Sequence, residues 1–196
     1  MTAHEGSIVD YEIGRKKITQ RGLPLIAVPT TAGTGSEVTW WSVITDPARG
    51  AKFDVGSPHM AAVLALVDPE VTHGLPPALT AATGLDALTH AIEAVSTRGH
   101  HPITDALALE AIRLLGEHLP LAYAEGRNAA ARRGTMLGAV TAGLAFPNAG
   151  LGAVHGLTAP LGGRLGVPHG QANAALLPAV MRFNLDAATA AYARID

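Results

Sequence analysis

A change of hydrophobic period at Pro76 constrains the fold more than any other feature of this sequence. Upstream of it, four short apolar runs bounded by turn residues predict β-strands, and the second and third are expected to pair as a hairpin. These runs lie at 23–29, 41–45, 52–55 and 62–67. Runs that are apolar on both faces are typical of strands in the interior of a sheet. Downstream, a period of 3.6 predicts helices.

The downstream part is expected to be entirely helical. Pro77 suits the first turn of a helix, where an N–H group is not needed, and Gly84 predicts a break before the next helix. Further helices are predicted at 102–120, 127–145, 150–161 and 171–184. The predicted fold class is therefore an α/β remnant with a few strands, residues 1–70, followed by a mainly α-helical domain, residues 71–196.

The composition excludes several classes of function. The net charge is −2 and the Lys and Arg residues are scattered, so nothing predicts a nucleic-acid partner. The chain has no cysteine, which rules out disulfides and thiol chemistry. Its longest apolar stretch, 61–67, is far shorter than the about 20 residues that span a bilayer. We expect a cytoplasmic protein without a membrane partner, whose core is built from small side chains because only eight residues are aromatic.

Four residues have the types and spacing of one mononuclear metal site. Asp86 and His90 are one helical turn apart, so a helix places the carboxylate and the imidazole on the same face. His155 and His169 each precede a glycine, in GAVHG and GVPHG, where the backbone can bring a ligand close. One oxygen and three nitrogens without a thiolate suit Fe(II), Zn(II) or a similar divalent ion.

A loop rich in glycine and hydroxyl groups, TTAGTGSE at 30–37, directly follows the first predicted strand. Its backbone N–H groups and hydroxyls are able to surround one anion, as phosphate-binding nests do. It matches neither standard phosphate fingerprint, because it lacks the lysine of a P-loop and has Val38 where a Rossmann motif has its third glycine. Taken alone, the loop fits an anion site and an ordinary strand-ending turn equally well.

The order of these motifs closely resembles that of the iron-containing (group III) alcohol dehydrogenase family. The matching segments are PLIAVPTTAGTGSEVT, LVDPEVTHGLPPALTAATGLDALTHAIEA, PITDALALEAIRLL and NAGLGAVHGLTAPLGGRLGVPHGQANAALLP. The resemblance covers the chain from Asp10 to Asn184. It implies an NAD(P)-dependent alcohol dehydrogenase of dehydroquinate synthase-like architecture, with the active site between a nucleotide-binding domain and a helical metal-binding domain.

By the same resemblance, Asp86, His90, His155 and His169 are the metal ligands. The metal acts as a Lewis acid on the oxygen of a small-molecule alcohol or carbonyl substrate, and hydride passes between the substrate carbon and nicotinamide. The resemblance also implies a homo-oligomer, a dimer, for the full-length protein. The residues that it assigns to the NAD or NADP site are Thr30, Thr31, Ala32, Gly33, Val43 and Lys52.

Two departures from the family pattern limit this assignment. Many members have a further histidine four residues after the third ligand, assigned to proton transfer or nicotinamide contact, and this chain has Ala159 there. We therefore assign no catalytic residue beyond the metal ligands, and a maleylacetate reductase-like branch, which also varies here, is one alternative. Members also carry a Gly-Gly-Gly-Ser-x-x-Asp segment upstream of the Thr/Gly loop. We expect a truncated internal piece of a dehydrogenase, with complete metal ligation and an incomplete cofactor site.

Two other functions stay open. The first is a truncated, non-catalytic fragment that binds metal without turnover. The second is a helical metal-dependent hydrolase, which is less favoured because such enzymes usually have an adjacent His-Asp pair and this sequence has none. Outside the four ligands, Glu93 and Glu110 lie on predicted helices and are expected on solvated faces.

Overall fold

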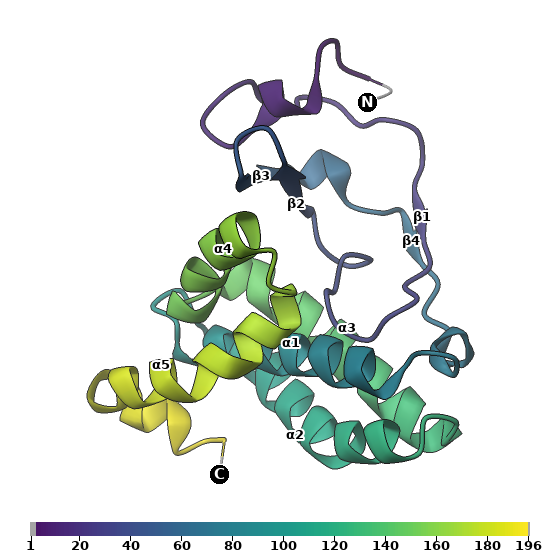
Figure 1. Cartoon of the computed structure of the whole chain (residues 1–196), viewed down its shortest axis with the longest axis vertical. Helices are drawn as coiled ribbons and strands as arrows, with labels where there is room; N and C mark the ends of the chain where they lie inside the picture. Colours follow the sequence, from purple (N-terminus) through teal and green to yellow (C-terminus); the bar gives the residue numbers. More distant parts are fainter. Residues whose placement is uncertain (1–2, 196) are drawn as a thin grey trace.

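A central helix, α1 (Pro77–Ser96), organises the downstream part of the molecule, because α2, α3 and α5 all pack against it (Figure 1). The structure is a computed structural model that describes residues 3–195. The remaining helices are α2 (Pro102–Ala124), α3 (Ala129–Ala149), α4 (Ala153–Leu165) and α5 (His169–Tyr192). The expected change from strands to helices is confirmed, since every regular element after residue 76 is a helix among the described residues.

Small side chains let these helices lie close together. The largest buried cluster lies where α1, α2 and α3 meet, and most of its members are alanines: Ala91, Ala94, Ala108, Ala111, Ala142, Ala145 and Ala149, with Val95 and Phe146. A second cluster, around Leu115 and Met136, includes Ala32 of the Thr/Gly loop. The expected core of small residues is confirmed, and the loop is anchored to it.

Several expected helix boundaries are wrong. Helix α3 ends at Ala149 and not at residue 145, α4 at Leu165 and not at 161, and α5 at Tyr192 and not at 184. Helix α1 begins at Pro77 as predicted, but it continues through Gly84 without a break. A Cβ on Gly84 would overlap the side chain of Leu119 on α2, so this glycine serves the close approach of two helices. Helix α2 likewise passes through Pro120 and ends at Ala124. Proline there removes one N–H donor in the final turns of the helix, and the turns on either side are still made.

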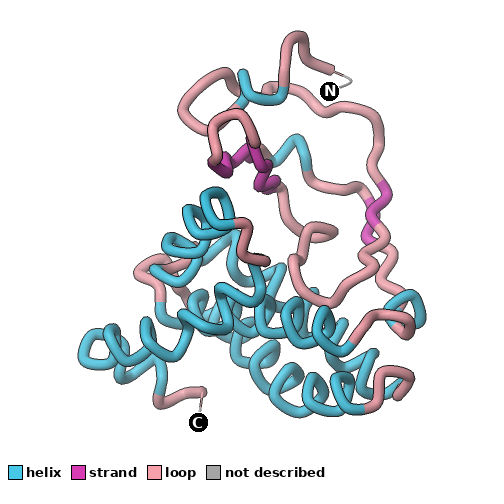
Figure 2. Tube along the Cα trace, in the orientation of Figure 1, coloured by secondary structure: helices cyan, strands magenta, loops and turns pink. Residues whose placement is uncertain are grey.

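The strands form two separate pairs. β2 (Trp41–Asp46) and β3 (Ala51–Gly56) make the predicted antiparallel hairpin. β1 (Ile26–Ala27) and β4 (Leu64–Ala65) pair in parallel, but each is only two residues long, and loops make up most of this part of the molecule (Figure 2). The expectation of sheet-interior strands is wrong here, since Ile26 is 58% and Leu64 is 52% exposed.

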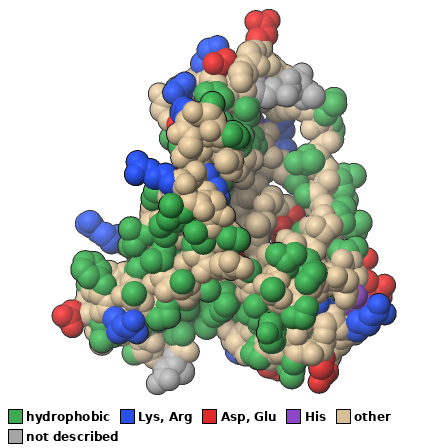
Figure 3. All heavy atoms as spheres, viewed as in Figure 1, with side chains coloured by type: hydrophobic (Ala, Val, Ile, Leu, Met, Phe, Trp, Pro, Cys, Tyr) green, Lys and Arg blue, Asp and Glu red, His purple; other side chains and the backbone are tan. Residues whose placement is uncertain are grey.

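The strand-bearing part contacts the helices at several places. Strand β3 packs against α4, and the Thr/Gly loop lies on α3. The loop contact joins two glycines, because a Cβ on Gly35 would lie 2.7 Å from the Cα of Gly143. Gly35 also has φ of +65°, a conformation that favours glycine. Between these contacts the surface is hollowed (Figure 3).

Within the described residues, no single helix is long and apolar enough to cross a membrane. Helices α3 and α4 pass such a test only as a pair, by length and composition, and the pair is bent by 103° at its break.

Candidate metal centre

Three helices supply the four candidate ligands. Asp86 and His90 are both buried in the middle of α1, one turn apart as expected. His155 lies in the first turn of α4, and His169 is the first residue of α5. Because α1 packs against α5, and α4 packs against α5, residues that are far apart in the sequence meet at one point.

The ligand atoms of these residues lie at distances that suit one cation. The Oδ1 atom of Asp86 is 3.9 Å from Nε2 of His90, 3.7 Å from Nε2 of His155 and 3.5 Å from Nε2 of His169. In a tetrahedral site with bonds of about 2.1 Å, ligand atoms are about 3.4 Å apart. Asp86, His90 and His155 form a compact potential metal-binding group, and the half-buried His169 lies beside it.

Neighbouring groups hold the rings in place. The ring of His90 stacks between those of Phe146 and His155, at centroid distances of 4.3 and 4.6 Å, while its Nδ1 has no hydrogen-bond partner. Asn173 is fully buried and donates from Nδ2 to Oδ1 of Asp86 at 2.6 Å, leaving its own Oδ1 without a partner. The same Nδ2 atom lies 3.1 Å from Nε2 of His155 and 3.3 Å from Nε2 of His169, so it sits where these ligand atoms converge. A buried set of one carboxylate and three imidazoles fits a divalent ion, which would take the place of this amide nitrogen.

The charges in the site favour a cation. Burial alone would raise the pKa of Asp86, but His90, His169 and His155 lower it to about 2, so the group is a carboxylate at neutral pH. Burial lowers the pKa of His90 to about 4, which keeps this ring neutral. Burial also opposes protonation of His155, yet its hydrogen bonds to Asp86 and Glu93 outweigh burial and raise its pKa to about 9 in the metal-free protein. Protons and metal therefore compete for His155.

Glu93 corrects one of the sequence-based expectations. It was expected on a solvated face, but only 4% of it is exposed, and its carboxylate contacts His155. Glu110, in contrast, is exposed and pairs with Arg113, as expected. The sequence did hold a signal for Glu93, because it follows Asp86 by seven residues and His90 by three and so shares their helical face.

A cleft of about 950 Å³ separates the strand-bearing part from the helices and reaches Asp86, His90 and His169. Four of the predicted cofactor residues line it: Thr30, Thr31, Val43 and Lys52. The structure does not place Ala32 and Gly33 in its lining. Ala32 is in the helical core, and a Cβ on Gly33 would lie 2.8 Å from the backbone oxygen of Thr83. Sequence reasoning missed Glu37, Trp40 and Trp41, which also line the cleft.

The position where many family members have their further histidine lies on α4. Ala159 follows His155 by one helical turn and is half-buried. It offers neither a proton nor a ligand atom.

Fold and site together define a class of protein in which a helical domain carries a candidate mononuclear metal site at the edge of a cleft. Two family profiles match the chain: "Fe-containing alcohol dehydrogenase family, C-terminal" over residues 80–196, and "Iron-containing alcohol dehydrogenase" over residues 1–69. The chain therefore belongs to the iron-containing alcohol dehydrogenase family, which is a family of enzymes.

Individual relatives agree with this membership. Choline dehydrogenase of Bacillus subtilis is 46% identical over 98% of this chain and 48% of its own length. The crystal structure of 1,3-propanediol oxidoreductase superposes with a TM-score of 0.94 at 45% identity, over 98% of this chain and 50% of that one. Sulfoacetaldehyde reductase from Bifidobacterium kashiwanohense in complex with NAD+ gives 0.87 at 42% identity, over 92% of this chain and 48% of that one. The chain spans about half the length of the curated relatives it matches.

Proposed function

We propose that this chain carries the metal centre and part of the nucleotide cleft of an NAD(P)-dependent alcohol dehydrogenase that acts on a small-molecule alcohol or carbonyl compound. The observation that carries the proposal is the convergence of Asp86, His90, His155 and His169 at the edge of a cleft of about 950 Å³. The names of relatives, which include dehydrogenases and a reductase bound to NAD+, support the reaction class.

The roles of the chain's own residues follow from their positions. Asp86 supplies a negative charge, and the three imidazoles supply neutral nitrogen ligands for Fe(II) or Zn(II). A bound divalent ion supplies Lewis-acid chemistry toward the substrate oxygen. His169 faces the cleft and is the ligand closest to solvent, so it marks the side from which substrate enters.

The opposite wall of the cleft suits a nicotinamide cofactor, NAD or NADP. Thr30 and Thr31 bring hydroxyl groups to it, and Val43 brings an apolar surface. Lys52 brings a positive charge, which lies near enough to His169 to help burial lower the pKa of that ring. Hydroxyls and an ammonium group are suited to the ribose and phosphates of a dinucleotide, while hydride transfer belongs to the cofactor itself.

Metal analysis tests the centre. We expect the purified chain to retain about one divalent ion per chain after dialysis, because a four-ligand site holds one ion. The Asp86→Ala/His90→Ala double variant should retain none. His100→Ala/His101→Ala, which changes two histidines outside the site, is the matched control and should bind as the unchanged chain does. Absence of metal from the unchanged chain, or metal in the double variant, would contradict the proposal.

A nicotinamide assay tests the reaction and separates the proposal from a non-catalytic fragment. Oxidation of short-chain alcohols, followed by formation of NADH or NADPH, is to be measured on metal-loaded protein. Turnover that disappears in Asp86→Ala/His90→Ala supports the dehydrogenase, and Lys52→Ala should mainly raise the KM for the cofactor. Metal binding without turnover by this chain would identify the fragment alternative.

A further inference from the structure

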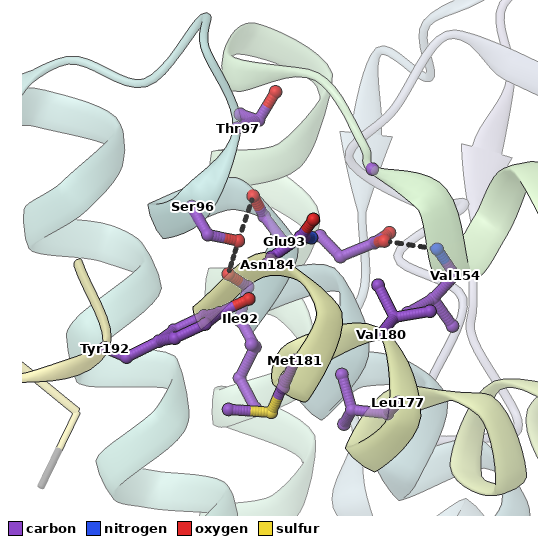
Figure 4. Close-up of a pocket in the computed structure, with 11 residues that line it drawn as sticks. Ile92, Glu93, Ser96, Thr97, Val154, Leu177, Val180, Met181, Asn184 and Tyr192 are labelled. Carbon is purple, nitrogen blue, oxygen red and sulfur yellow. Dashed lines mark hydrogen bonds between the residues drawn. The ribbon is translucent and has the colours of Figure 1, made fainter. Parts of the chain in front are cut away.

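Glu93 has two hydrogen-bonded contacts that the proposed reaction does not explain. Its Oε2 lies 2.6 Å from Nδ1 of His155, and its Oε1 accepts the backbone N–H of Val154 at 2.7 Å. The second contact is drawn in Figure 4. Both contacts reach the first turn of α4, although Glu93 itself lies more than sixty residues earlier, on α1. One side chain therefore ties together the two helices that carry three of the four ligands.

The contact with Val154 takes the place of a missing helix cap. Helix α4 begins after Gly152, which has no side chain to accept a hydrogen bond from the first N–H groups of the helix. The carboxylate of Glu93 accepts one of these donors from outside, and a negative charge at a helix N-terminus is also favoured by the helix dipole. Gly152 leaves the necessary room, because a Cβ there would lie 2.7 Å from Oε1 of Glu93.

The contact with His155 selects the ring's tautomer. An ionised carboxylate only accepts hydrogen bonds, so the proton of a neutral His155 is held on Nδ1. The lone pair of Nε2 is then directed into the site, where this atom lies 3.7 Å from Oδ1 of Asp86 and 3.1 Å from Nδ2 of Asn173. In metal sites, a carboxylate behind a histidine ligand fixes the ring and increases its basicity. The other stacked ligand, His90, has no such partner on Nδ1.

The surroundings of Glu93 exclude a direct role in the reaction. It is absent from the lining of the 950 Å³ cleft, and it borders a separate cavity of about 40 Å³ instead (Figure 4). That cavity is lined by a mixture of apolar side chains, such as Ile92 and Leu177, and polar ones, such as Ser96 and Asn184. It has room for one or a few water molecules and not for a substrate. Any effect of Glu93 on the site therefore passes through His155 or through the start of α4.

We propose that Glu93 is a positioning residue, whose single buried carboxylate caps α4 and holds the His155 ring with Nε2 directed toward the metal position. The inference rests on the proposed metal centre and assigns it a second carboxylate outside the four ligands. The two negative charges of Asp86 and Glu93 then balance the charge of one divalent ion. Asp86 would bind the ion directly, and Glu93 would contact the ligand His155.

The test compares Glu93→Gln with Glu110→Gln, the same chemical change on an exposed helical glutamate. The amide of the glutamine cannot accept both hydrogen bonds, so affinity for Co(II) or Zn(II), measured by competition with a chromophoric chelator, should fall about 10- to 100-fold. The visible absorption of the Co(II)-loaded protein should also change, because a differently oriented His155 alters the ligand field at the metal. Glu93→Asp, which keeps the charge on a shorter side chain, should recover part of the affinity, and it replaces Glu93→Gln if that variant does not fold.

The outcomes are separable. An unchanged affinity and an unchanged Co(II) spectrum in Glu93→Gln, with normal binding by the unmodified chain, would overturn the role of Glu93 alone. Loss of stability with the affinity and the spectrum both retained would show a purely structural cap and would also overturn it. Failure of the unmodified chain to bind Co(II) or Zn(II) would overturn the metal centre itself. An equal loss in Glu110→Gln would show that the effect is not specific to His155.

Discussion

Asn173 is the residue whose contribution is easiest to isolate, because it contacts the candidate metal ligands and is not one of them. Its Nδ2 lies 2.6 Å from Oδ1 of Asp86. Asn173→Ala leaves a buried carboxylate without this donor, which should lower the free energy of unfolding by about 1.5–3 kcal/mol. The affinity for Zn(II) should rise, because Nδ2 also lies 3.1 Å from Nε2 of His155 and 3.3 Å from Nε2 of His169 and therefore competes with a cation for these ligand atoms.

Chemical denaturation in chelator and a zinc competition assay measure the two effects of Asn173→Ala. Asn148→Ala is the matched control, since Asn148 is exposed on α3 and bonds only to the carbonyl of Leu144. Equal stability and affinity in Asn173→Ala and Asn148→Ala would show that the short contact to Asp86 has no energetic role.

The positions of single residues were predictable where helix geometry alone determines which side chains lie next to each other. The spacing of Asp86 and His90 places them on one helical face in any fold, and the structure agrees. The positions of His155 and His169 depend on how α4 and α5 pack, so residue type and neighbouring glycines made them candidate ligands and the resemblance supported that role. Glu93 was misplaced because a lone glutamate on a helix usually faces solvent, and its partner lies 62 positions away.

At the scale of elements, two glycines that each follow a candidate ligand are expected to respond in opposite ways to substitution by alanine. A Cβ on Gly170, after His169, would overlap the backbone carbonyl of Ala82 on α1, whereas a Cβ on Gly156, after His155, would meet nothing. Gly170→Ala must therefore push the start of α5 away from α1 and carry His169 out of the site. Gly156→Ala should instead stabilise α4 by up to about 1 kcal/mol, because alanine is the better helix former.

Thermal unfolding and metal titration distinguish these glycines. We expect Gly170→Ala to lose stability and to bind Zn(II) at least about tenfold more weakly, as expected for a ligand displaced from its site. Gly156→Ala should melt at a higher temperature with its affinity unchanged. If both variants bind Zn(II) equally well, the approach of α5 to α1 does not position His169.

Helices and strands were predictable where the local sequence determines their type and their ends. The five helices follow from the 3.6 period, and the hairpin of β2 and β3 follows from two strands and a short turn. Gly84 and Pro120 were misread, because whether such residues end a helix depends on contacts with another helix. The runs that become β1 and β4 have the composition of interior strands, but a strand extends only as far as it has a partner to pair with.

At the scale of the whole molecule, the order of motifs predicted the family, and the profile matches confirm it. The boundary near residue 70 between a nucleotide-binding part and a metal-binding part stays a prediction. No local pattern gave the placement of the hairpin over α4 or the size of the cleft. Both depend on contacts such as the one between Gly35 and Gly143, where two glycines allow a loop and a helix to meet.

The parallel pair of β1 and β4 leads to a prediction about the behaviour of the chain in solution. Ile26 and Leu64 are register partners, and both are more than half exposed, as are Leu25, Val63 and Leu66 beside them. Among the described residues, no further strand pairs with either of these two. Short apolar strands with unpaired backbone groups are templates for pairing with another copy. We therefore expect the isolated chain to self-associate through this pair.

Sedimentation velocity across a wide range of protein concentration measures this association. The sedimentation coefficient of the unchanged chain should rise with concentration, while Ile26→Lys/Leu64→Glu should remain monomeric, because opposite charges on paired strands keep the pair intact and oppose docking of a second apolar strand. Phe183→Lys is the control, since Phe183 is 87% exposed on α5, far along the chain from the strands, and should associate as the unchanged chain does. Two results would contradict this prediction. One is an unchanged chain that is monomeric at every concentration, and the other is association that only Phe183→Lys abolishes. Either would show that copies do not associate through the exposed apolar surface of β1 and β4.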